Sequence, residues 1–270
     1  MTSRDPLQRR FTQTSRIAQQ WLTEWWRLAH LGAVLLVLAL SPSSYNPESR
    51  KILTRQIYLN TAPILVGFSV LCALVTVVLT RIVLVTAQSY GLSQYALQVV
   101  IRVLILELIP LTAALFVALR CTIPDGAELT AMQARGELDD MRRQGQDPVR
   151  REVLPRVVAG MFSGITLAAL SSMVALVVAY MAGYGFTTSG IEAYVRLSGQ
   201  VFSPAVTLIF ILKTLLFSLA VALIPMASAL YGMRGLHGAG VRTSTEMRGL
   251  VRMFAVILLI EVASLVGNYY

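Results

Sequence analysis

Five apolar runs dominate this sequence, and each is long enough to cross a lipid bilayer as an α-helix. A helix rises about 1.5 Å per residue, so about 20 apolar residues span the hydrocarbon core. The runs fall at residues 64–85, 95–119, 157–180, 205–230 and 250–266. Only 14% of the residues are charged, whereas soluble domains carry about 25%. The sequence therefore predicts an all-α integral membrane protein with five transmembrane helices.

The first 60 residues are expected to form an N-terminal unit of interfacial and elbow helices, followed by a transmembrane domain over 61–270. Residues 8–27 place Trp and Arg on a moderately apolar helical pattern, which is typical of a helix lying in the membrane interface. The apolar run 31–40 is too short to span the membrane. We expect it to dip into the bilayer as a re-entrant helix or to lie along it.

The distribution of Lys and Arg predicts the orientation. Arginine is frequent before the first span, between the second and third spans and before the last span. The loop 86–94 has no basic residue, and the loop 181–204 has only Arg196. Because cytoplasmic loops are enriched in Lys and Arg, we expect a cytoplasmic N-terminus and an external C-terminus. The net charge of +9 then reflects these loops, and nucleic acid is not an expected partner.

A densely charged insert, residues 124–156, separates the second and third apolar runs. Asp125 and Glu128 have the spacing of a capping box, and Gly145 stands where a C-terminal cap belongs. The sequence predicts one short amphipathic cytoplasmic helix over 125–145. Its apolar stripe would consist of Ala127, Ala131, Ala134, Leu138 and Met141. Composition leaves open whether this helix is a solvated connector or a docking helix, and whether the stripe faces a partner or the membrane domain.

Ionisable residues within or near the spans are candidates for a functional site, because burying a charge at mid-bilayer costs at least about 2.5–3.5 kcal/mol. They are Arg81, Arg102, Glu107, Lys213 and Glu261. Glu107 lies deepest, and Pro110 predicts a kink just after it. Glu107 either forms a polar site in a cavity or makes a structural pair with Arg102, Lys213 or a partner chain. Lys213 is a candidate headgroup contact or a structural ion pair, and Arg81 and Glu261 are expected near span ends.

No motif on this chain predicts catalysis. The two His and two Cys residues lack ligand-like spacing, so no metal site is expected. No phosphate-binding G-x-x-x-x-G-K-[ST] motif and no nucleophile–His–acid set is present. The chain is therefore not expected to be an enzyme or to hold a cofactor, and any energy source must come from another polypeptide. The G-x-x-x-G motif at 160–164 is expected to pack helices within one subunit.

The stretch 107–155 resembles the signature of the MlaE/YrbE family of ABC-transporter permeases. The matching residues include Glu107, Leu108, Pro110, Arg120, Glu128, Leu129, Met132, Asp139, Gly145, Asp147, Pro148 and Pro155, and the match continues at Arg156. The motif "RQIY" at 55–58, Lys213 with Phe217, and Glu261 are similar to further family positions. The chain departs from the signature at Leu106, where the family has Arg, and at Ile109, Leu119 and Thr130, where it has Gly.

The resemblance implies a permease subunit in the bacterial inner membrane that works as a homodimer. Each copy would bind a cytoplasmic ABC ATPase subunit, which holds ATP and Mg²⁺, and a periplasmic Mce-domain protein would carry the phospholipid or similar lipid. The insert would be the coupling helix on the ATPase. We expect ATPase coupling through Glu128, Leu129, Met132, Leu138, Asp139, Met141 and Asp147, and a substrate cavity with Glu107, Leu108 and Lys213. The alternative is an ATPase-independent transporter or channel for an apolar solute.

Overall fold

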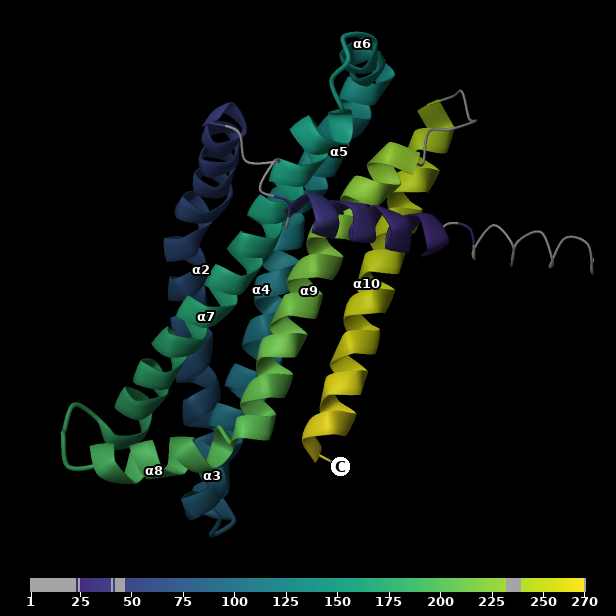
Figure 1. The fold of residues 1–270 in the computed structure, drawn as a ribbon. Helices are drawn as coiled ribbons and strands as arrows, with labels where there is room; N and C mark the ends of the chain where they lie inside the picture. Colours follow the sequence, from purple (N-terminus) through teal and green to yellow (C-terminus); the bar gives the residue numbers. More distant parts are fainter. Residues whose placement is uncertain (1–22, 24, 40, 42–46, 232–238, 270) are drawn as a thin grey trace, which may run out of the picture.

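The computed structural model describes residues 23, 25–39, 41, 47–231 and 239–269. Among these residues every regular element is a helix, and five helices are long and apolar enough to cross a membrane. These five lie side by side as a bundle (Figure 1). The prediction of five transmembrane helices is thus confirmed. The interfacial helix expected at 8–27 falls almost entirely outside the described residues.

The helices extend well beyond the apolar runs at several ends. In chain order the labelled elements are α2 (Pro47–Ser89), α3 (Ser93–Ile101), η2 (Arg102–Leu108), α4 (Ile109–Val117), η3 (Ala118–Thr122), α5 (Ile123–Ala134), α6 (Glu137–Arg143), η4 (Val149–Val153), α7 (Leu154–Tyr184), α8 (Ile191–Val201), α9 (Pro204–Tyr231) and α10 (Ala239–Tyr269). α2 passes through residue 60 without a break. α10 begins at Ala239, within the arginine-containing stretch that precedes the last apolar run.

The second span, α3 to α5, forms one helix from Tyr95 to Ala134. Two π-helical segments, η2 and η3, interrupt its α-helical geometry. Each ends two residues before a proline, Pro110 or Pro124, and η4 stands in the same relation to Pro155. Proline lacks the N–H of the regular ladder and clashes with the preceding turn, and a wider π turn accommodates both effects. A π-helical segment thus precedes Pro110, and the kink expected there stays a prediction.

The core of the bundle is formed where α7 packs along α2 and against α9, which in turn packs against α10. The contact of α7 with α9 depends on two glycines. A Cβ on Gly160 would lie 3.3 Å from Ala222 Cβ of α9 and 2.9 Å from Thr122 Cγ2 of η3, and a Cβ on Gly164 would lie 2.6 Å from Ser218 Oγ of α9. The motif at 160–164 therefore packs helices within one subunit, as predicted.

The two ends of the bundle carry different elements. The start of α2, the tip at α6 and the start of α10 lie at one end, and α8 and the C-terminus lie at the other (Figure 1). A short apolar helix, Trp25–Ala39, crosses the bundle and buries Leu31 and Leu35 against α9 residues such as Leu223. At the opposite end α8 runs across the bundle axis within the segment expected to be a plain loop.

Candidate functional site

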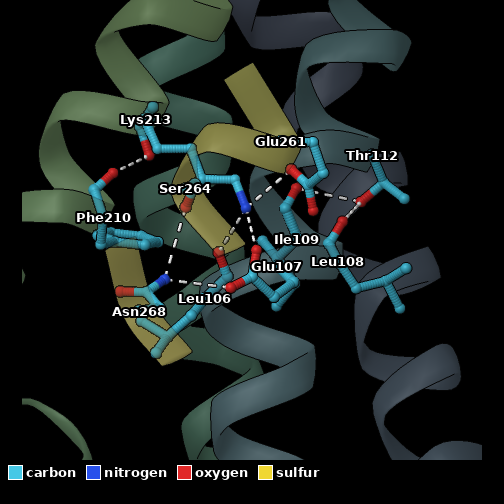
Figure 2. Close-up of polar contacts among 11 residues, drawn as sticks. Leu106, Glu107, Leu108, Ile109, Thr112, Phe210, Lys213, Glu261, Ser264 and Asn268 are labelled. Carbon is cyan, nitrogen blue, oxygen red and sulfur yellow. Dashed lines mark hydrogen bonds and ion pairs between the residues drawn. The ribbon is translucent and has the colours of Figure 1, made fainter. Parts of the chain in front are cut away.

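A cluster of three charged side chains lies inside the bundle, around Lys213 of α9. The Lys213 ammonium forms ion pairs with Glu107 of η2 and with Glu261 of α10, the latter at 2.8 Å. Figure 2 shows both carboxylates directed at the Lys213 nitrogen. The side chains of the three residues are 1%, 11% and 18% exposed, respectively. Burial without pairing would be costly for each charge, so the two acids and the base stabilise one another.

Neutral polar groups complete the cluster. Asn268 Nδ2 donates a hydrogen bond to Glu107 Oε1 at 3.2 Å and approaches Ser264 Oγ at 3.5 Å. The Lys213 nitrogen also lies 5.6 Å from the centroid of the Phe217 ring, within the range of a cation–π contact. The acid, hydroxyl and amide of α10 therefore line the same face of that helix, one to two turns apart.

The proline in the second span helps to hold Lys213 in place. In an α-helix the N–H of residue 110 would donate to the carbonyl of Leu106, but Pro110 has no N–H. Lys213 Nζ instead donates to the Leu106 oxygen at 3.2 Å. The backbone thus provides a third acceptor for the ammonium group, in addition to the two carboxylates.

The structure brings together two of the three residues predicted for a substrate cavity. Glu107 and Lys213 pair directly, which agrees with the structural ion pair that the sequence left open. Leu108 is half-buried, and its side chain points away from Lys213 in Figure 2. Glu261 was expected near a span end and is instead part of the cluster. The sequence indicates this role through the spacing of Glu261, Ser264 and Asn268. Steps of three and four residues place all three on one face of a helix.

The charged insert differs from the predicted single helix. α5 continues the second span without a new start, and no side-chain cap is formed at its beginning. Asp125 lies inside this helix and accepts a hydrogen bond from Asn60. Gly136, at φ +80°, ends the helix and begins α6. Such a left-handed conformation is readily adopted only by glycine, so the insert forms an elbow of two helices, α5 and α6.

The predicted apolar stripe is also wrong in its first half. Ala127 and Ala134 are exposed, whereas Leu129 and Met132 are buried. Leu138 of α6 is only 2% exposed and packs, with half-buried Met141, against the apolar cluster of α7 and α9. The apolar side of the elbow therefore faces the membrane domain. The capping glycine was predicted correctly, since Gly145 has φ +75° and directly follows Gln144, the C-cap of α6.

The outer surface of the elbow is charged. Of the seven residues expected to couple to an ATPase, Glu128, Asp139 and Asp147 are exposed. Arg142 donates a hydrogen bond to Asp139 at 2.6 Å. Arg135 and Glu137 pair across Gly136, and the hydrogen bond from Arg135 lowers the pKa of the Glu137 carboxyl. Leu129, Met132 and Leu138 hold the elbow to the bundle and cannot themselves contact a partner in this conformation.

A comparison with known protein families covers most of the chain, including the cluster and the elbow. A family model described as permease MlaE matches residues 53–266, which include all five spans except the first residues of α2 and the last of α10. The chain belongs to the MlaE permease family. In this MlaE permease, Leu106 stands where the family signature has an arginine. Its side chain is buried among apolar residues of α3 and α7.

Curated relatives of this MlaE permease are found in Rickettsia. A protein of Rickettsia prowazekii (strain Madrid E), named as a probable ABC transporter permease, is 26% identical over 166 residues. Proteins of Rickettsia conorii and Rickettsia felis with similar names are each 25% identical over 166 residues. Each match covers 59% of this chain and 64% of the relative. The chain thus spans slightly less than two thirds of the length of the curated relatives it matches.

Proposed function

We propose that this chain is the permease subunit of an ABC transporter that moves phospholipids or similar lipids. In this proposal two copies pair in the bacterial inner membrane, and each binds an ATPase subunit at the α5–α6 end. A periplasmic Mce-domain protein exchanges lipid with the other end, where α8 and the C-terminus lie. The family match supports the permease role, and the names of the Rickettsia relatives support the link to ABC transport.

The observation that carries the proposal is the rigid, charged elbow at one end of the bundle. Leu138 and Met141 hold its inner side against α7 and α9, while Asp139, Asp140 and Arg142 are exposed on its outer side. A helix held in this way can transmit force from a water-soluble partner to the spans. Among the described residues, the same end carries the arginines of the insert, which help to predict the cytoplasmic side, where an ATPase has access to ATP.

The buried cluster supports a further part of the proposal. Charged residues inside a membrane domain are rare, and they mark transport pathways or the contacts that hold such a pathway together. Glu107, Lys213 and Glu261 join three spans at one point. We place the lipid path beside this cluster, with Glu107 and Lys213 setting the polarity of its wall.

The docking proposal is tested by reversing one exposed charge on the elbow. Asp139→Arg places a positive charge next to Arg142 on the proposed docking surface without touching the buried side of α6. We expect an ATPase to co-purify with the wild-type chain from its native host and to be lost from the variant. The matched control is Glu192→Arg on α8, because Glu192 is also exposed and paired with an arginine, Arg196 at 3.8 Å.

Lipid measurements separate this proposal from its alternative. Bound phospholipid in the purified complex, and ATP-dependent loss of labelled phosphatidylethanolamine from proteoliposomes, are the expected results. A chain that binds no ATPase and transports an apolar solute alone would instead identify an ATPase-independent transporter. Equal ATPase retention by Asp139→Arg and Glu192→Arg would contradict docking at the elbow.

A further inference from the structure

A second polar network lies at the base of the elbow, away from the Lys213 cluster. Its centre is Arg156, in the first turn of α7, whose side chain is only 9% exposed. One guanidinium nitrogen, Nη2, lies 3.4 Å from the Glu128 carboxylate of α5 and 3.2 Å from the Glu152 carboxylate of η4. Arg156 therefore joins the chain leaving the second span to the chain entering the third.

Two further contacts of Arg156 reach deeper into α5. Nη1 donates to the backbone oxygen of Asp125 at 3.4 Å, and Nη2 lies 3.7 Å from the Met132 sulfur. The guanidinium group thus contacts α5 at Asp125, Glu128 and Met132, which lie on consecutive turns. A planar group with several fixed donors can bridge such a set, whereas a lysine ammonium cannot reach all of these acceptors at once.

The network continues from α5 to α2. The Asp125 carboxylate accepts a hydrogen bond from Asn60 Nδ2 at 3.2 Å. The next residue, Thr61, shares a 2.8 Å hydrogen bond with Ser163 of α7, and the Asn60 carbonyl accepts from the Cys121 thiol at 3.4 Å. A movement of α5 is therefore passed to both α2 and α7 at this level of the bundle.

Close packing on the far side of α5 limits how it can move. A Cβ on Gly126 would lie 3.3 Å from the Pro225 oxygen of α9, so the two backbones are nearly in contact. α5 is thus held between α9 on one side and the polar network of α2 and α7 on the other. Because it continues the second span without a break, the elbow cannot move independently of these helices.

We infer that Arg156 is the positioning residue that couples movement of the α5–α6 elbow to the spans α2 and α7, with Asp125 as its link to α2. This inference rests on the proposed ATP-driven lipid transport. It assigns to Arg156 and Asp125 a role in transmission and none in holding the ATPase, since Arg156 is buried and half-buried Asp125 bonds to Asn60 of α2. Loss of the network should therefore separate ATP hydrolysis from lipid movement.

The test compares Arg156→Lys and Asp125→Ala, which removes the acceptor for Asn60 Nδ2, with wild type in the complex purified from the native host. The matched control is Arg196→Lys, because Arg196 pairs with Glu192 at the same i,i+4 spacing as Arg156 with Glu152 but is exposed at the other end. Each complex is placed in proteoliposomes of phosphatidylethanolamine and phosphatidylglycerol with a fluorescent phosphatidylethanolamine. ATPase content, ATP hydrolysis and labelled lipid moved per ATP are measured.

We expect both network variants to retain the ATPase and its hydrolysis, while lipid moved per ATP falls about tenfold, within the usual range of coupling between sites. The Arg196→Lys control should match wild type. An unchanged ratio of lipid to ATP in Arg156→Lys and Asp125→Ala overturns the inference, as does a parallel loss of hydrolysis and transport. A wild-type chain that binds no ATPase and moves no lipid overturns the proposed function and the inference together.

Discussion

At the scale of single residues, Lys213 is held by three polar partners from two other spans. Its ammonium group is shared by Glu107 and Glu261, which come from different spans, and by the carbonyl oxygen that Pro110 leaves without its helical donor. The cluster therefore fixes the rotation of α9 and α10 relative to the second span. Its polar groups are also mutually dependent, since removing one leaves others buried without a partner.

Lys213→Met should lower the free energy of unfolding by about 3–5 kcal/mol, the usual result of removing one partner from a buried ion pair. The variant would leave the carboxylates of Glu107 and Glu261 buried near each other without a cation. The measurement is denaturant unfolding of the purified chain in detergent micelles. Adding Glu107→Gln and Glu261→Gln to the same variant should restore most of the stability, because no unpaired charge remains. A triple variant as unstable as Lys213→Met would contradict this account.

Sequence reasoning reached part of this cluster. Glu107 and Lys213 stand out because each is an isolated charge in an apolar run, and their pairing was one of the two interpretations it left open. The partner Glu261 could not be assigned in the same way, since its distance from the end of its run also allows a charge that reaches the interface. Which spans are neighbours decides the pairing, and one sequence does not contain that information.

At the scale of helices, the contact between α7 and α9 depends on the absence of side chains. Gly160 and Gly164 lie one turn apart on α7, opposite Ala222 and Ser218 of α9. In a bilayer the hydrophobic effect does not favour contact between helices over contact with lipid. Close approach of backbones is therefore a main source of helix association. The packing of the third and fourth spans should therefore be sensitive to single methyl groups at these two positions.

Gly160→Ala should reduce the free energy of unfolding by about 1–3 kcal/mol, the usual cost of an added group in a tightly packed site. The new methyl would meet Thr122 Cγ2 at 2.9 Å and Ala222 Cβ at 3.3 Å, and neither can rotate far away. Gly67→Ala is the matched control, because a Cβ at Gly67 of α2 meets nothing within 4 Å. Thermal unfolding in detergent compares the two, and equal stability of both variants would contradict the packing argument.

The errors of prediction at this scale have identifiable physical causes. The stripe expected over 125–145 assumed one helix, whereas Gly136 at φ +80° changes the direction of the chain and with it the buried face. α8 was missed because a loop of that length was taken as a connector, although Ile191, Tyr194 and Val201 follow a helical spacing. Tyr194 is buried there and donates a hydrogen bond to the Leu176 carbonyl at 2.8 Å.

At the scale of the whole molecule, five spans place the elbow and the C-terminus at opposite ends (Figure 1). Composition alone predicted the number of spans, because each long apolar run has no alternative to the membrane. The direction of insertion is predicted from the arginines, which are frequent before the first span, in the insert and before the last span. It is a separate prediction, since the same bundle could in principle insert either way.

Single cysteines at the two ends test this orientation. In a variant with Cys72→Ala and Cys121→Ala, Gln200→Cys on α8 should react with a membrane-impermeant maleimide in intact cells. Gln144→Cys at the end of α6 should react only after the inner membrane is permeabilised. Both native cysteines are buried, so their replacement removes background labelling without altering the surface. The opposite labelling pattern would show an inverted topology. The elbow would then lie outside the cytoplasm, where a cytoplasmic ATPase could not bind it.

The continuous second span also determines how far a tilt at one of its ends displaces the other end. From Glu107 to Ala134 the helix rises about 40 Å, at about 1.5 Å per residue. A rod of that length pivoting near Glu107 by about 5° displaces its tip by about 3–4 Å. A small tilt of the helix near the buried charges thus displaces Gly136 by several ångströms. Conversely, a displacement of Gly136 tilts the helix near Glu107. An antibody fragment bound to the elbow would therefore be expected to restrict the tilt of the span at its opposite end.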